Sequence, residues 1–72
     1  MSKLPALKPK RVIRALERNG FHLHHVRGSH HFLRKGERNV VIPYHTKDLK
    51  PGTLRAIIDH SGLTVEEFLA LL

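Results

Sequence analysis

Apolar residues recur at helical spacing near both ends of the chain and alternate with polar residues in its middle. Pro9 suits the first turn of a helix, because its missing N–H group is not needed there. Apolar positions then follow at helical spacing, at Val12, Ile13 and Leu16. Asn19-Gly20 supplies a stop signal, so a first helix is expected over about residues 9–19. Its other side carries a basic stripe of Lys10, Arg11, Arg14 and Arg18.

Three short segments in the middle of the chain predict three strands. Residues 21–27 and 30–35 alternate in side-chain type, and residues 40–42 are strongly β-forming. Gly28-Ser29 marks the turn between the first two strands, and residues 36–39 mark the second turn. Short connections of this kind predict an antiparallel meander.

Alternation along each strand divides the side chains between two faces. One face of the second strand carries His30, Phe32 and Arg34. The opposite face carries His31, Leu33 and Lys35. In the first strand His22 and His24 share a face, and His25 is expected on the other. We expect Phe32 to pack in the core, with stacking on a nucleic-acid base as the alternative.

The remainder of the chain predicts two more helices. Residues 44–50 form a polar loop, Pro51 opens the next helix, and Ser61-Gly62 ends it. Thr64 and Glu67 fit a capping box at the start of a short final helix. The order α-β-β-β-α-α predicts an α+β fold in one domain, residues 1–72, with helices on one face of the sheet and the other face open.

Composition narrows the functional classes. The chain has 72 residues and no cysteine, which excludes disulfides and zinc–thiolate sites. No apolar run approaches the roughly 20 residues of a membrane span, and the N-terminus lacks the apolar core of a signal peptide. We therefore expect a cytoplasmic protein with no membrane association.

Charge indicates a class of partner. Thirteen Lys and Arg oppose six Asp and Glu, which gives a net charge of +7. All thirteen bases lie within residues 1–55, whereas residues 56–72 hold three acids and no Lys or Arg. A basic body of this kind suits a polyanion, most simply nucleic acid. The basic stripe of the first helix either contacts RNA or is a solvated helix face, and both interpretations stay open.

Six of the seven histidines lie between residues 21 and 45, which raises the question of a metal site. His22 and His24 are spaced so that both side chains leave one face of a strand. A zinc site needs three or four ligands, and no metal-binding motif such as HExxH is present. We therefore expect neither a resident metal nor another cofactor.

Acid–base chemistry on RNA is a second interpretation of the histidines. RNA carries its own nucleophile, the 2′-hydroxyl, so cleavage needs a base, an acid and cations near the phosphate. A histidine after Gly28-Ser29 has those surroundings, and the turn can bring backbone N–H groups to a phosphate oxygen. The alternative is a histidine that is merely packed or solvent-exposed. The candidate phosphate-binding residues are Arg27, Gly28, Ser29, His31, Arg34, Lys35, Lys47 and Lys50.

Four segments, in order along nearly the whole chain, resemble the HicA (YcfA-like) family of small toxins. They are "LPALKPKRVIRALERNGF", "RGSHHFLR", "VVIPYHTKDLKPGTLRAII" and "SGLTVEEFL". The resemblance implies a fold like the double-stranded RNA-binding domain. It also implies a type II toxin–antitoxin toxin, an endoribonuclease that cleaves mRNA independently of the ribosome. Its partner would be a HicB-type antitoxin that covers the active site.

The same resemblance implies roles for two histidines. The family's catalytic histidine directly follows Gly-Ser, which is His30 in this chain. His45, after Pro43-Tyr44, matches a frequent family histidine and is the candidate for a second proton carrier or a phosphate contact. We expect cleavage by 2′-OH attack, without metal. A noncatalytic RNA-binding module on the same fold is the alternative.

Overall fold

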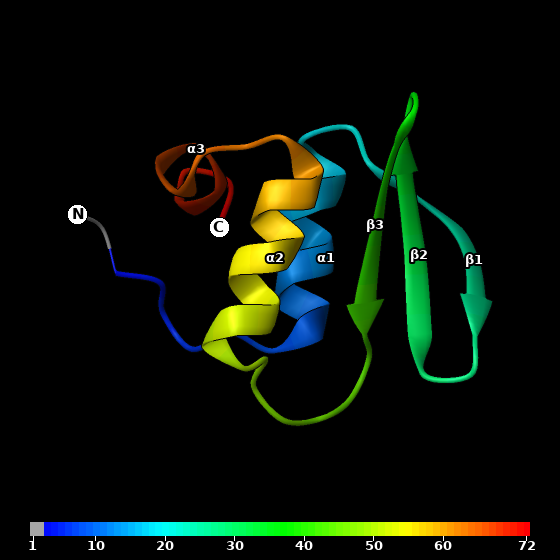
Figure 1. Ribbon diagram of the computed structural model, residues 1–72, viewed down its shortest axis with the longest axis horizontal. Coiled ribbons are helices and arrows are strands. Elements are labelled where there is room, and N and C mark those ends of the chain that lie inside the picture. Colours follow the sequence, from blue (N-terminus) through cyan, green and yellow to red (C-terminus); the bar gives the residue numbers. More distant parts are fainter. Residues whose placement is uncertain (1–2) are drawn as a thin grey trace.

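The chain folds into three helices and three strands, seen in a computed structural model that describes residues 3–72 (Figure 1). The elements are α1 (Pro9–Arg18), β1 (His22–Arg27), β2 (His30–Lys35), β3 (Arg38–Pro43), α2 (Pro51–Ser61) and α3 (Val65–Leu69). Both strand pairings are antiparallel and the strand order is β1-β2-β3, so β2 is central. The predicted α-β-β-β-α fold with an added C-terminal helix is confirmed.

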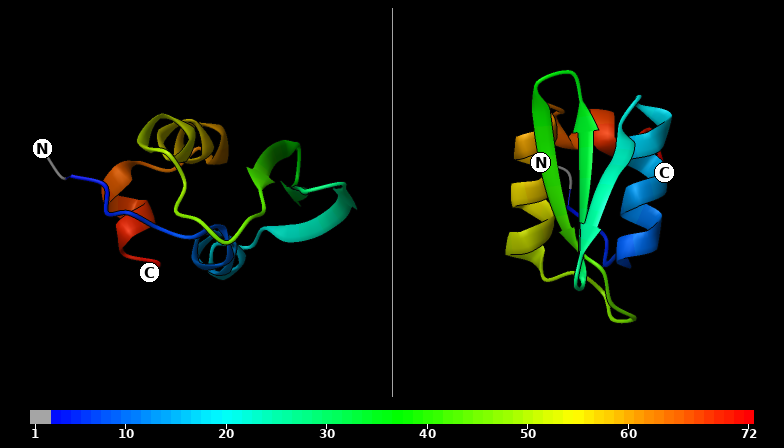
Figure 2. Two further views of the ribbon diagram at one scale, coloured as in Figure 1. Left: turned by 90° about the horizontal axis from the view of Figure 1, so that it is seen from below. Right: turned by 90° about the vertical axis from the view of Figure 1, so that its right-hand side faces the viewer.

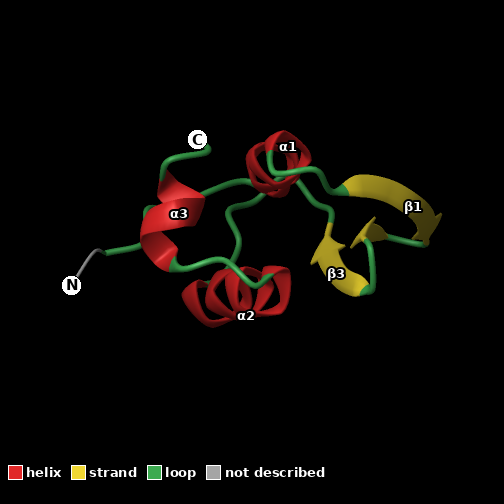
Figure 3. Cartoon of the chain, turned by 90° about the horizontal axis from the view of Figure 1, so that it is seen from above, coloured by secondary structure: helices red, strands yellow, loops and turns green. Residues whose placement is uncertain are grey.

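The helices all lie on one side of the sheet. Helices α1 and α2 lie next to each other behind the strands, and α3 lies beyond them, on the side away from the sheet (Figures 2 and 3). Fully buried side chains come from each layer, including Leu33 and Ile42 from the sheet, Leu16 and Leu54 from the helices, and Phe68 from α3. Among residues 3–72, no helix or loop covers the opposite face of the sheet, as Figure 2 shows.

The register of the strands determines which side chains point away from the helices. Leu33, Val40 and Ile42 are buried, and Leu33 pairs with Val40. Their neighbours along each strand therefore point outward, because successive side chains alternate between faces. We call the resulting surface the open face. Its residues are His22, His25, Arg27, His30, Phe32, Arg34, Asn39, Val41 and Pro43.

The prediction that His24 and His25 lie on opposite faces is wrong. The β1–β2 register shifts between Leu23 and His25, so His24 is an extra residue in β1. An extra residue of this kind interrupts alternation and bends the strand. As a result, the Nδ1 atoms of His24 and His25 approach to 2.8 Å, where one imidazole donates a hydrogen bond to the other.

Phe32 does not pack in the core, contrary to the sequence-based prediction. Leu33 takes the core position of β2, and the period of two sends Phe32 to the open face. There its ring stacks on that of His25, with centroids 4.2 Å apart and an interplanar angle of 10°. The Phe32 side chain is half-buried on this face.

The ends of the helices agree with the predicted signals. Pro9 and Pro51 occupy the first turns of α1 and α2, and Gly62 ends α2 with a φ of +80°. Thr64 and Glu67 form the predicted capping box of α3. Within residues 3–72, no helix has the length and apolar character needed to cross a membrane.

Candidate active site

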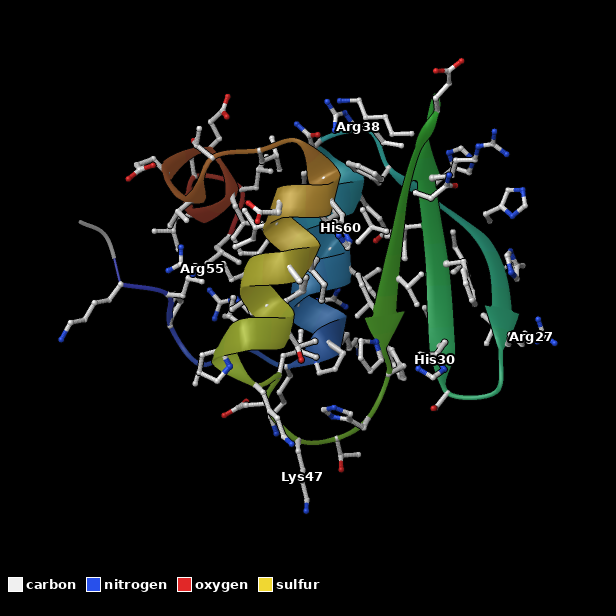
Figure 4. All side chains as sticks on the ribbon, viewed as in Figure 1. Arg27, His30, Arg38, Lys47, Arg55 and His60 are labelled. Atoms are coloured by element: carbon white, nitrogen blue, oxygen red, sulfur yellow. The ribbon has the colours of Figure 1, made fainter. Side chains whose placement is uncertain are left out.

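The turn between β1 and β2 determines the position of His30. Gly28 has a φ of +58°, in the left-handed region that favours glycine. A Cβ atom added at Gly28 would have no other heavy atom within 4 Å, so the surface beside this residue is open. The tight turn makes His30 the first residue of β2 and sets it opposite Arg27 on the open face (Figure 4).

The loop that follows β3 is attached to this turn. The backbone N–H of Tyr44 donates to the carbonyl of Ser29 with an N···O distance of 2.6 Å. The Tyr44 ring also stacks on His31, with centroids 4.2 Å apart. His30 and His45 directly follow the two bonded residues, so these contacts bring the backbones of both candidate proton carriers to one end of the sheet.

Cations lie at the same end of the molecule. Arg27 and Lys47 both lie toward the end of the sheet where His30 is found (Figure 4). Lys50 is the exposed N-cap residue of α2, at the end of the same loop. Lys8 donates from its Nζ to the carbonyl of Thr46, at 3.2 Å, and so ties the loop to the segment before α1. The arrangement places positive charge around His30 without burying it.

Three of the expected phosphate contacts lie away from His30. Arg34 shares the open face but is four residues further along β2, about 13 Å at the usual rise of a strand. Its Nε donates to the carbonyl of Gly36, at 3.0 Å. Lys35 and His31 point to the opposite side of the sheet, where Lys35 donates to Asn19 Oδ1 at 3.1 Å.

His31 has a packing role in this structure. Its half-buried ring lies against Tyr44, and its Nδ1 atom is buried with no hydrogen-bond partner among residues 3–72. Buried polar atoms of this kind are uncommon, because an unpaired group pays for its lost hydration. The stack therefore joins β2 to the loop that carries His45.

Two contacts near the site were not predicted from the sequence: that of Tyr44 with the turn, and the ring pair of Phe32 and His25. The alternation of β2 already predicted that Phe32 lies on the same face as His30, and this pattern could have located the Phe32 ring on the open face. His25 was assigned to the wrong face relative to His24, because the extra residue in β1 leaves no mark in its hydrophobic pattern.

The histidine-rich region contains no cluster of metal ligands within residues 3–72. Within residues 3–72, no three His, Asp or Glu side chains come together in an arrangement that could hold a metal ion. The His24–His25 pair offers two nitrogens that already contact each other. The candidate proton carrier His30 and the candidate phosphate ligand Arg27 flank the Gly28-Ser29 turn.

Comparison with known proteins gives one family match. The family model described as "HicA toxin of bacterial toxin-antitoxin" matches residues 9–63, which is more than half of the chain. The matched region runs from the start of α1 past the end of α2, and it includes the Gly28-Ser29-His30 turn. No curated protein sequence matches the chain.

Proposed function

The chain belongs to the HicA toxin family and is the toxin of a toxin–antitoxin pair, and from this premise we propose that it is an endoribonuclease that cleaves mRNA independently of the ribosome. The observation that carries the proposal is the pairing of His30 with Arg27 across the turn, on an open sheet face. A proton carrier and a phosphate-binding cation are then adjacent on a surface that a polynucleotide can reach.

In the proposed reaction, His30 in its neutral form takes the proton of a ribose 2′-hydroxyl. The 2′-oxygen forms a bond to phosphorus, and the bond from phosphorus to the 5′-oxygen of the next nucleotide breaks. The products are a 2′,3′-cyclic phosphate and a 5′-hydroxyl. Arg27 stabilises the charge that develops on the phosphoryl oxygens. His45 is our candidate for the acid that protonates the leaving 5′-oxygen.

We further propose that the antitoxin is of the HicB type and covers this site, and that the toxin acts in the cytoplasm, where its mRNA substrate lies. The free toxin presents His30 and Arg27 to solvent, so a covering partner would block access to both. A net charge of +7 favours an acidic covering surface.

The test is expression of the wild type and of His30→Ala in a bacterium that lacks the antitoxin. We expect wild-type expression to stop growth and fragment mRNA, and His30→Ala to do neither. His22→Ala is the matched control, because His22 is an exposed histidine of the same face at the other end of β1. It should behave as the wild type.

Mapping of the RNA ends tests the chemistry separately. Cyclic or 3′-phosphate ends support 2′-OH attack, whereas 3′-hydroxyl ends contradict it. If growth and mRNA are unaffected by the wild type while the purified protein still binds RNA, the chain is a noncatalytic RNA-binding module, and the nuclease proposal fails.

A further inference from the structure

We propose that the open face binds a single-stranded segment of RNA, with one base stacked on the ring pair of Phe32 and His25. This inference rests on the proposed function and specifies the form of the substrate at the same site. Three observations carry it: the position of the ring pair, the charge of the open face, and the short distance between the ring pair and His30.

The ring pair stands on the solvent side of the sheet. Phe32 and His25 are cross-strand neighbours, and their rings are nearly parallel at a centroid distance of 4.2 Å. Val41, the neighbour of Phe32 on β3, remains 40% exposed and extends the apolar strip across the sheet. Aromatic side chains on an open sheet are the usual support for unpaired bases, whose flat faces stack on them.

The ring pair is next to the proposed catalytic group. Phe32 follows His30 by two residues on the same strand, so both side chains leave the same face about 7 Å apart. A base held at Phe32 and a phosphate held at His30 would then belong to the same or to adjacent nucleotides. Stacking would hold the scissile ribose beside the imidazole, which is a positioning contribution to catalysis.

The charge of the open face suits a phosphate backbone. None of its nine residues, all within the described part of the chain, is acidic, and Arg27 and Arg34 lie near its two ends. Arg34 is too far from His30 to serve the reacting phosphate. It is well placed for a phosphate of a neighbouring nucleotide, along a strand that runs parallel to β2.

Stacking on a protein ring requires a base whose face is free. A base inside a duplex is covered on both faces by its neighbours, so it cannot reach Phe32 without being unstacked. The ring pair therefore selects unpaired regions of a message over its helical regions.

The test uses purified protein carrying His30→Ala, so that RNA is bound without being cut. The probes are a fluorescently labelled single-stranded RNA of mixed sequence, the same strand in a duplex, and an oligonucleotide with abasic riboses that keeps the phosphates. We expect the single strand to bind more tightly than either the duplex or the abasic strand. Adding Phe32→Leu, which keeps an apolar side chain, should weaken single-strand binding by about 5-fold to 150-fold.

Further variants separate stacking from folding. Phe32→Tyr keeps the ring and should restore the affinity, whereas His25→Ala changes an exposed residue and should lower it without altering the thermal unfolding temperature. His60→Ala, at an exposed histidine of α2 outside the open face, should leave binding unchanged. Phe32→Leu should have no effect on the abasic strand, because that strand has no base to stack.

Equal affinity for single strand and duplex would overturn the inference, and so would unchanged affinity in Phe32→Leu and His25→Ala. The ring pair would then serve only contacts within the protein or with a protein partner. These binding results do not depend on cleavage. Absence of cleavage by the wild type would refute the nuclease proposal alone, whereas unchanged binding with continued cleavage would refute the stacking inference alone.

Discussion

Arg27 and His30 are held together by the antiparallel register, which sets their Cα positions opposite each other on either side of a two-residue turn. Both side chains are exposed, so burial does little to hold either one in place. The preorganisation of the pair therefore lies in the backbone: the left-handed Gly28 and the ladder between β1 and β2.

Removal of the Arg27 guanidinium should slow cleavage without unfolding the protein. We expect Arg27→Ala to lower the single-turnover cleavage rate by about 100-fold, because a donor to the developing phosphoryl charge is lost. The cleavage rate of Arg27→Lys should fall between those of the wild type and Arg27→Ala, since lysine keeps the charge but not the two-point hydrogen bond. Arg55→Ala is the control, because Arg55 lies on α2 away from the sheet (Figure 4). Arg27→Ala cutting at the wild-type rate would remove Arg27 from the mechanism.

At the scale of the elements, the loop after β3 depends on Tyr44 for its position. Tyr44 is 40% exposed, so its replacement should cost little stability. We expect Tyr44→Ala to lower the turnover number more than the affinity for RNA, because the stack on His31 that orients the loop is lost. Tyr44→Phe keeps the ring and should retain activity. Equal activity of Tyr44→Ala and the wild type would show that the loop needs no such support.

The capping box of α3 makes stability depend on pH. Backbone and side-chain hydrogen bonds with Thr64 hold the pKa of Glu67 below its ordinary value of 4.5. A lowered folded-state pKa stabilises the fold fully above the unfolded pKa, and this stabilisation is lost as the pH falls through the folded pKa. Glu67→Gln should therefore lower Tm at pH 7 and match the wild type in strong acid. A Tm difference that persists in strong acid would contradict the assignment of the stabilisation to the charge of Glu67.

Removal of the other half of the box tests the cap itself. Thr64→Ala should cost about 1 kcal/mol in the free energy of unfolding at pH 7, because the N–H of Glu67 loses its acceptor. The effect reaches the core, since the next residue of α3, Phe68, is fully buried. Urea unfolding measures the difference in the free energy of unfolding. Glu37→Ala, at an exposed turn position, is a suitable control.

The sequence predicted the elements better than the side-chain positions within them. Helical spacing around Val12 and Leu16 and the proline starts at Pro9 and Pro51 identified the helices, because these signals are local. The extra residue at His24 escaped prediction, since a bulge is chosen by pairing with β2 and leaves the composition of β1 unchanged. The contact of Tyr44 with Ser29 was missed for the same reason: it joins residues that only the β2–β3 pairing brings together.

For the whole molecule, positive charge extends well beyond the candidate active site. The basic stripe of α1 lines a cleft of about 440 Å³ together with Lys8 and Leu72. Charges spread over a surface raise the rate of encounter with a polyanion, and salt screens that attraction. We therefore expect the stripe to assist the capture of RNA without touching the reacting phosphate.

Neutralisation of the stripe should act on association alone. We expect Arg11→Gln combined with Arg14→Gln to slow RNA association by about 3-fold to 10-fold at low salt and not at high salt. Dissociation and single-turnover cleavage of bound RNA should stay unchanged. Stopped-flow fluorescence at several salt concentrations measures these rates, and faster dissociation would instead indicate direct contact between the stripe and RNA.

The extra residue of β1 affects how the exposed edge of the sheet can pair with other strands. β1 is an edge strand, and Leu23 and Val26 on its helix-facing side remain 48% and 50% exposed. A regular edge of this kind invites another strand to pair with it and can nucleate aggregation. The bulge at His24 breaks the row of N–H and C=O groups, so we expect this edge to pair poorly with a second copy of the toxin when no antitoxin is bound.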